Sequence, residues 1–173
     1  MSLIETERLH MRPVQQSDAA DLYRLHNDPL VVKLTSNGVG MSRIRSDERL
    51  KLYLHEWRRF GFGFFVVYEK ESSGNHNFVG RCGLRNLGGN EVEIGYCFTT
   101  QASGRGLATE AATRIVRFAF AHCKLSKLVG LVRPTNLQSA RVLQKLGFTY
   151  TAMCRERGTT YQRYDLEADE RIT

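Results

Sequence analysis

The hydrophobic residues in the middle of the chain change their spacing once, near residue 100. Over residues 91–98 apolar side chains alternate with polar or small ones, the period of two that is typical of a β-strand: Val92, Ile94, Tyr96 and Phe98. From Gly104 onward the apolar residues recur at helical spacing: Leu107, Ala108, Ala111, Ala112, Ile115 and Ala119. The pattern therefore predicts a strand, a short turn and a largely apolar helix.

The rest of the chain shows the same two periods. Before the central stretch they predict a strand at 4–12, a helix from about 17 that stops before Asp28, a loop at 34–41, a helix at about 42–60, and strands at 63–70 and 77–87. After it they predict a short strand at 127–133, a helix at 136–145, and a hairpin formed by 148–157 and 160–166. This order predicts an α+β fold, a central mixed sheet flanked by helices, in one domain over residues 1–173.

Composition narrows the class of protein. A chain of 173 residues with 42% hydrophobic residues suits one domain with a real core. No apolar run approaches the roughly 20 residues that cross a bilayer, and charges stand where a signal peptide needs apolar residues, so we expect a cytoplasmic protein without membrane contact. The four cysteines and five histidines show no metal-ligand spacing, and we expect no metal.

The net charge of +7 leaves the kind of partner open. It suits an anionic small ligand, an acidic protein surface or a nucleic acid. The basic residues are scattered along the chain and no nucleic-acid-binding motif accompanies them, so we expect no nucleic-acid partner. Arginines on the predicted 42–60 helix and in the last hairpin favour an acidic acceptor, but a solvated basic face explains most of them equally well.

The turn before the central helix has the residues of an anion-binding site. It reads Gln101-Ala102-Ser103-Gly104-Arg105-Gly106. The first turn of a helix has unpaired backbone N–H groups and the positive end of the helix dipole, and glycines let a phosphate approach them closely. Arg105 adds a positive charge at the rim. A tight turn that uses glycine for its geometry alone would read the same way, so the motif needs context.

Residues 133–148, RPTNLQSARVLQKLGF, supply that context. A strand, a QxxGxG turn and a helix, followed by a strand and an N-x-x-S-A-x-x-x-L-x-K-L-G-F helix, resemble the GNAT superfamily of acetyl-CoA-dependent N-acetyltransferases. The opening IETERLHMRP and the GLATEAA helix are similar to the branch that includes the ribosomal-protein N-terminal (Rim-type) acetyltransferases. The resemblance covers nearly the whole chain.

The resemblance implies where acetyl-CoA binds. In the family the QxxGxG loop holds the pyrophosphate through backbone amides, and the preceding strand binds the pantetheine arm through its backbone. That strand splays from the one after the helix, here between 91–98 and 127–133. The asparagine of the later helix bonds the pantetheine or a water, and it also suits the N-cap of that helix. The residues expected to contact the coenzyme are Tyr96, Cys97, Phe98, Gln101, Ser103, Gly104, Arg105, Gly106, Leu107, Ala108 and Asn136.

The resemblance also implies direct acetyl transfer in a ternary complex, without a cysteine nucleophile. A base must deprotonate the amine; Glu93 is the first candidate and Glu91 the second, although either could instead pair with an arginine. A backbone N–H near Phe98 is the expected oxyanion donor. Many family members have a tyrosine acid where this chain has Leu143. The Rim-type branch has a serine, here Ser139, three residues after the asparagine, so Ser139 is the candidate that protonates the thiolate. The alternatives are that Ser139 only orients the sulfur or the helix, and that the thiolate leaves without an acid.

Other functions fit the sequence less well. A Rossmann dinucleotide site lacks its third glycine, because Thr109 stands there, and no GK[ST] follows for a P-loop. A non-catalytic acyl-CoA sensor of the same fold is the main alternative, with Leu143 in its favour, and a nucleic-acid-binding module rests on charge alone. We expect an acceptor that is a primary amine, either a protein N-terminus or a small amine, and a monomer or homodimer.

Overall fold

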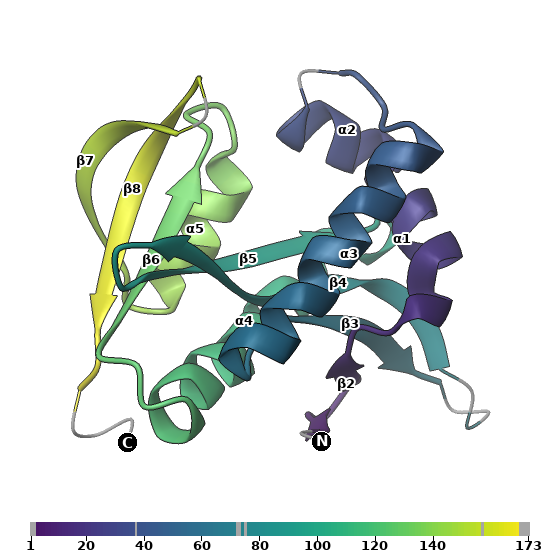
Figure 1. Cartoon of the computed structure of the whole chain (residues 1–173), viewed down its shortest axis with the longest axis horizontal. Helices are drawn as coiled ribbons and strands as arrows, with labels where there is room; N and C mark the ends of the chain where they lie inside the picture. The colour runs from purple at the N-terminus through teal and green to yellow at the C-terminus, as the bar shows by residue number, and fades with distance from the viewer. Residues whose placement is uncertain (1–2, 37, 72–73, 75, 157, 170–173) are drawn as a thin grey trace.

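Eight strands form one mixed sheet in the computed structural model, which describes residues 3–36, 38–71, 74, 76–156 and 158–169 (Figure 1). The strands are β1 (Ile4–Glu5), β2 (Leu9–Pro13), β3 (Phe64–Lys70), β4 (His76–Gly88), β5 (Glu91–Phe98), β6 (Lys127–Val132), β7 (Thr149–Glu156) and β8 (Thr159–Glu167). Their order is β1-β2-β3-β4-β5-β6-β8-β7. Neighbours run antiparallel except β5 and β6, so the predicted mixed, mostly antiparallel sheet is confirmed.

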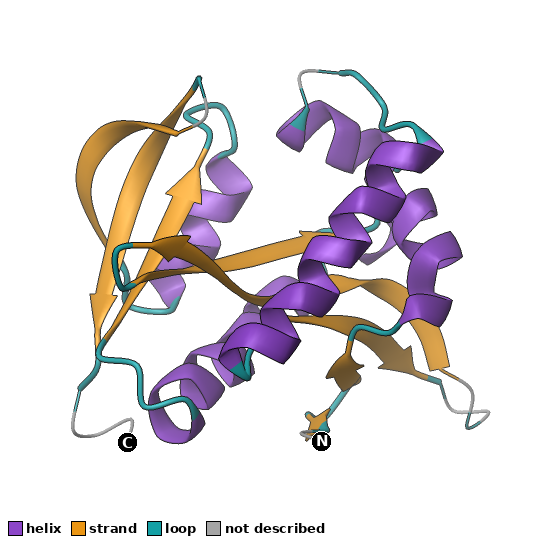
Figure 2. Ribbon diagram, viewed as in Figure 1, coloured by secondary structure: helices purple, strands orange, loops and turns teal. Residues whose placement is uncertain are grey.

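Helices cover both faces of this sheet (Figure 2). They are α1 (Ala19–His26), α2 (Pro29–Thr35), α3 (Arg43–Phe60), α4 (Leu107–Arg117) and α5 (Leu137–Lys145), with short helical turns at Gln16–Asp18, Thr100–Ala102 and Phe118–His122. Alternate residues of β3 assign the faces: Phe64 and Val66 pack in the core with α1 and α3, whereas Phe65 and Val67 pack in the core with α4 and α5. No helix within the described residues is both long and apolar enough to cross a membrane.

The structure differs from the predicted elements in two places. The first strand is two short strands, β1 and β2, which pair with each other. The second difference is α2, which the sequence did not predict because Asp28-Pro29 was interpreted only as a helix end. The Asp28 carboxylate caps α2 by accepting from the Leu30 N–H at 3.0 Å, and proline is well tolerated at the first helical position. Asn37 of the predicted loop and Arg157 of the predicted hairpin lie outside the described residues.

The strands β5 and β6, in the middle of the sheet, share fewer paired residues than the other neighbouring strands. The parallel ladder there contains one residue pair, Glu93 with Val129, whereas every residue of β5 pairs with β4. Figure 1 shows β5 running between the part that carries α1–α3 and the part formed by α5, β6, β7 and β8. The predicted splay between these strands is confirmed, and it leaves the edge of β5 beyond Glu93 without a strand partner on the β6 side.

Candidate functional site

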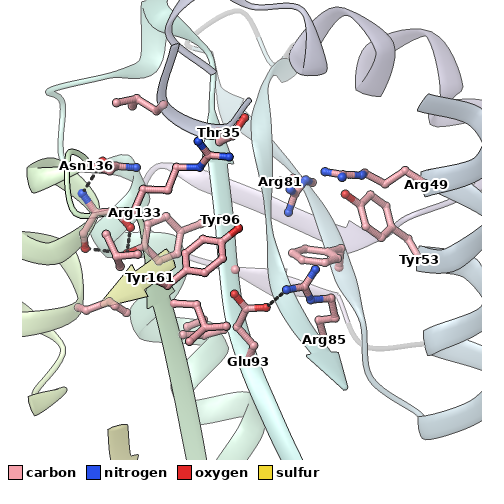
Figure 3. A pocket seen from close by; sticks show the side chains of 18 of the residues that line it. Thr35, Arg49, Tyr53, Arg81, Arg85, Glu93, Tyr96, Arg133, Asn136 and Tyr161 are labelled. Carbon is pink, nitrogen blue, oxygen red and sulfur yellow. Dashed lines mark hydrogen bonds and ion pairs between the residues drawn. The ribbon is translucent and has the colours of Figure 1, made fainter. Parts of the chain in front are cut away.

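Two cavities open beside this splay and meet at it. The α3 cavity, of about 340 Å³, lies between α3, β4, β5 and the end of β6 (Figure 3). The α4–α5 cavity, also of about 340 Å³, lies between the N-terminus of α4, the face of α5 and the end of β5. Among the described residues, Tyr96, Asn136 and Ser139 line both. Two ligands, one in each cavity, would therefore approach each other at these three side chains.

The α4 end of the second cavity has the geometry of an anion site. Gly106, the N-cap of α4, has φ +78° and Gly104 has φ +75°, backbone conformations that side-chain-bearing residues rarely adopt. No side chain caps α4, so the N–H groups of its first turn remain available to a ligand. A Cβ on Gly104 would meet nothing within 4 Å, which means that the turn is open on that side. The glycines thus serve the turn geometry and leave the helix end uncovered.

Most of the predicted coenzyme contacts line the α4–α5 cavity. The lining residues among them are Tyr96, Phe98, Ser103, Gly104, Gly106, Leu107, Ala108 and Asn136. The remaining predictions fall elsewhere: Cys97 is buried on the α3 face of β5, with a thiol pKa raised by burial, and Gln101 is exposed outside the cavity lining. The Arg105 guanidinium binds Glu69, with Nη1 2.8 Å from Oε2, and does not line the cavity.

Sequence reasoning assigned Asn136 and Ser139 to the site but missed three other polar residues of α5 that line this cavity. Gln138, Arg141 and Lys145 all line it. Their spacing of three and four residues places them on one side of the helix, a signal that was present in the sequence. The side chains of Arg141 and Lys145 and the N-terminus of α4 give the cavity positive charge on two walls, which suits a ligand that carries several phosphates.

Glu93 is at the floor of the α3 cavity. It lies directly opposite Arg85 in the β4–β5 register, and its carboxylate forms an ion pair with the Arg85 guanidinium. The residue is 9% exposed, and burial raises the pKa of its carboxyl although Arg85 acts in the opposite direction. Glu91, two residues earlier, does not line the cavity and pairs with Arg163, whose hydrogen bonds lower the pKa of Glu91. The two predicted base candidates therefore have different surroundings.

Tyr96 and Ser139 form a pair of hydroxyl groups where the cavities meet. The Tyr96 hydroxyl donates to the Ser139 carbonyl oxygen at 2.9 Å and lies 3.0 Å from the Ser139 hydroxyl oxygen. A phenol has one O–H to donate. When the Tyr96 hydroxyl donates to the Ser139 carbonyl oxygen, the Ser139 hydroxyl is the donor in the second hydrogen bond, to the phenol oxygen. Burial raises the pKa of Tyr96, which keeps the phenol protonated. Sequence reasoning assigned Tyr96 only a backbone role and missed this contact.

Asn136 and Leu143 complete the junction from α5. The Asn136 side-chain oxygen caps the helix by accepting from the Ser139 N–H at 3.1 Å, so the expected N-cap role is present. Leu143 is 1% exposed and reaches toward Gly130, where a Cβ would lie 2.4 Å from one of its methyl carbons. Leu143 therefore gives the cavity an apolar wall, and the hydroxyl groups beside it come from Tyr96 and Ser139.

Comparisons with known proteins agree with this geometry. The family described as "Acetyltransferase (GNAT) domain" matches residues 8–149. The chain is 28% identical over 155 residues to the "Uncharacterized protein YkkB" of Bacillus subtilis (strain 168), and the match covers 87% of each chain.

Solved structures share the fold. An acetyltransferase from Agrobacterium tumefaciens has a TM-score of 0.82 at 24% identity and covers 97% of this chain and 95% of its own. A ribosomal L7/L12 alpha-N-protein acetyltransferase, RimL, in complex with coenzyme A has a TM-score of 0.77 at 14% identity and covers 96% of this chain and 98% of its own. At these identities the likeness concerns the fold.

Proposed function

This chain belongs to the acetyltransferase (GNAT) family and is an acetyl-CoA-dependent N-acetyltransferase, and we propose that it transfers the acetyl group directly to a primary amine in a ternary complex. The observation that carries the proposal is the meeting of two cavities at Tyr96, Asn136 and Ser139. Donor and acceptor then enter from different sides, and no covalent enzyme intermediate is needed. We propose that residues 1–173 act in this reaction as one domain.

The α4–α5 cavity fits the coenzyme. The uncapped first turn of α4, with Arg141 and Lys145 on the facing helix, suits the phosphates, and the free edge of β5 near Tyr96 and Phe98 suits an extended arm. Gln101 and Arg105 would act through the backbone of the turn, and Arg8 holds that backbone by donating to the Arg105 carbonyl at 3.0 Å. When bound, acetyl-CoA supplies an acetyl thioester, whose reactive end would lie toward Ser139.

Glu93 is the proposed base. An amine is mostly protonated at neutral pH and must lose a proton before it can attack. The raised pKa of the Glu93 carboxyl makes its ionised form a stronger proton acceptor than an exposed glutamate, and Arg85 keeps that form accessible. We propose that Glu93 takes the proton through a water molecule in the α3 cavity. Glu91, which is held by Arg163 outside the cavity lining, has no part in this step.

Ser139 is the proposed group at the sulfur. Its hydroxyl lies at the junction and is positioned by Tyr96 and by the Asn136 cap of its own backbone N–H. We propose that the Ser139 hydroxyl turns from the phenol oxygen toward the departing sulfur and stabilises the developing thiolate with a hydrogen bond. The buried Tyr96 phenol stays protonated and keeps the Ser139 carbonyl as its partner. A free backbone N–H at the end of β5, near Phe98, is the proposed donor to the carbonyl oxygen.

The acceptor is proposed to be a protein N-terminus or a small amine that enters the α3 cavity. The test mixes the protein with acetyl-CoA and a panel of amines and peptides, follows free thiol release, and identifies the acetylated amine by mass spectrometry. We expect thiol release that depends on the amine and decreases in the Ser139→Ala variant. Thiol release at the same rate without any amine, or an acetyl group found on a cysteine of the protein, would overturn direct transfer.

A further inference from the structure

The α3 cavity has an excess of positive charge beyond what the proposed reaction uses. Four arginines and two glutamates line it: Arg49, Arg81, Arg85, Arg133, Glu56 and Glu93. Glu93 is paired with Arg85, and Glu56 accepts a hydrogen bond from the Asn86 backbone N–H at 3.0 Å. Within the described part of the chain, neither Arg49 nor Arg81 forms an ion pair with a carboxylate.

Arg81 is held in place by aromatic rings. Its guanidinium carbon is 4.3 Å from the centroid of the Phe64 ring and 5.2 Å from that of Tyr53. Its Nε is buried and has no hydrogen-bond partner in the described structure. Stacking on ring faces uses the flat side of a guanidinium and leaves its N–H edge available, which is the edge that binds a carboxylate or phosphate with two hydrogen bonds.

The Phe64 ring and Gly95 line the α3 cavity beside Arg81. Gly83 and Gly95 lie opposite each other in the β4–β5 register, between the pair Arg81–Cys97 and the pair Arg85–Glu93. A Cβ on Gly95 would lie 3.0 Å from the Phe64 ring on which Arg81 stacks. Gly95 therefore leaves room for the Phe64 ring, and on this face no side chain of β4 or β5 stands between Arg81 and the Arg85–Glu93 pair.

Arg49 and Tyr53 bring polar groups to Arg81 from α3. They are one helical turn apart, and Figure 3 shows the Arg49 guanidinium and the Tyr53 hydroxyl beside Arg81, at a distance from the Arg85–Glu93 pair. We propose that Arg49, Arg81 and Tyr53 form a subsite for an anionic group of the acceptor. The acceptor is then a small primary amine that also carries a carboxylate or phosphate group. This inference rests on the proposed function of the same cavity.

The β4–β5 register indicates how far the anionic group of the acceptor would lie from its amine. Arg81 and Arg85 are four residues apart on β4, which corresponds to about 13 Å along an extended strand. With the amine near Glu93, opposite Arg85, the anionic group lies several bonds away from it. An acceptor of this length fits a cavity of about 340 Å³, within the range of small-molecule sites.

The test compares matched amines with and without the charge. The panel contains ω-amino carboxylic acids of increasing chain length, their carboxamides, and aminoalkyl phosphates paired with amino alcohols, all assayed by thiol release with acetyl-CoA. We expect one chain length at which the anionic amine exceeds its neutral partner by about tenfold or more in kcat/KM, through KM. The carboxylate and phosphate arms show which anion the subsite prefers.

Variants assign the preference to the subsite. Arg49→Gln changes an exposed side chain and should reduce the preference for the anionic amine about tenfold, while the KM for acetyl-CoA stays the same. Arg81→Lys keeps the charge of the stacked residue but removes its two-pronged geometry, and should reduce the preference as well. Arg58→Gln is the control, because Arg58 lies nine residues from Arg49, on the opposite side of α3 and outside the cavity lining.

The outcomes separate the two proposals. Equal use of charged and neutral amines by the wild-type protein, or a preference that survives in both Arg49→Gln and Arg81→Lys, would overturn the subsite and leave acetyl transfer standing. Absence of transfer to every amine in the panel, charged or neutral, would overturn the proposed function together with the subsite. A decrease in Arg58→Gln equal to that in Arg49→Gln would show a general effect of charge and would also overturn the subsite.

Discussion

Replacing Glu93 with Gln removes the charge of the proposed base and keeps its size. The Glu93 side chain is 11% exposed, and its carboxylate pairs with Arg85 on the neighbouring strand. Burial opposes its ionised form more strongly than Arg85 favours it, so the pKa of Glu93 is raised above its ordinary value. Burying a neutral amide at this position costs less desolvation free energy than burying the ionised carboxylate. We therefore expect Glu93→Gln to lose activity with little loss of stability.

The expected loss of catalytic rate in Glu93→Gln is much larger than the expected loss of folding stability. Loss of a general base lowers the rate by about 10²- to 10⁴-fold, which corresponds to roughly 3–5 kcal/mol on the barrier. Removal of one partner from a fully buried ion pair costs about 3–5 kcal/mol of stability. Here the Arg85 side chain is 37% exposed and regains water, and the burial cost of Glu93 is relieved. The net change in stability should stay below about 1 kcal/mol, or about 2–4 °C in Tm.

The sign of the pH dependence follows from the raised pKa. The stability that protonated Glu93 contributes is present below its pKa in the unfolded chain and is lost as the pH rises through its raised pKa in the folded protein. Wild-type Tm should therefore fall relative to that of Glu93→Gln as the pH rises through this range. Activity has the opposite sign, because the base must be ionised: wild-type kcat/KM decreases as the pH falls through the same pKa.

The assay is steady-state thiol release across this pH range, with thermal unfolding in the same buffers. Glu91→Gln is the matched control, since Glu91 lies on the same strand, pairs with Arg163 and does not line the α3 cavity. It should retain wild-type kcat/KM and lose no more than about 1 kcal/mol of stability. Activity of Glu93→Gln within threefold of wild type, or a larger loss in Glu91→Gln, would refute the assignment of the base.

Three further predictions concern the junction and the coenzyme cavity. Ser139→Ala should lower kcat about tenfold with little change in the KM for acetyl-CoA, and a wild-type kcat would exclude the Ser139 hydroxyl from the reaction. Tyr96→Phe, which removes the 2.9 Å hydrogen bond to the Ser139 carbonyl, should cost about 1–2 kcal/mol in chemical denaturation, and wild-type stability would mean that this hydrogen bond does not stabilise the fold. Gly106→Ala should cost about 1–2 kcal/mol at φ +78° and weaken coenzyme A binding in calorimetry, whereas Gly61→Ala, at φ +72° at the end of α3, should cost as much stability and leave binding unchanged; equal weakening in both would mean that the turn is only structural. Leu143→Ala should lose about 2–5 kcal/mol because its side chain is 1% exposed, and a loss below 1 kcal/mol in urea unfolding would show that the site collapses around the smaller residue.

Local patterns in the sequence predicted the elements that form the coenzyme cavity. The alternation over 91–98, the glycine turn and the Asn136 cap each depend on residues close together in the chain, and β5, the α4 turn and α5 lie where these signals place them. The α2 helix was missed because Asp28-Pro29 serves both as the end of one helix and the start of the next. A dipeptide that fits both roles does not tell which one the chain uses.

The α3 cavity could not be predicted in the same way. Arg49 comes from a helix, Arg81 and Arg85 from β4, and Arg133 from the segment after β6, so their proximity depends on tertiary packing and strand register. In the sequence they resemble any scattered surface arginines. Arg105 shows the converse: its position beside the glycines indicated a role at the cavity rim, but Glu69, 36 residues away, holds its side chain.

The single residue pair between β5 and β6 also has a consequence for how the protein opens. It divides the sheet into a five-stranded unit, β1 to β5, against which α3 packs, and a three-stranded unit, β6, β8 and β7. The helices α4 and α5 contact each other across the boundary between the two units. Amide hydrogens along this boundary should exchange faster than those of β3 and β4, since fewer backbone hydrogen bonds must break to expose them. A ligand that bonds the free edge of β5 would slow that exchange and make the two units unfold together.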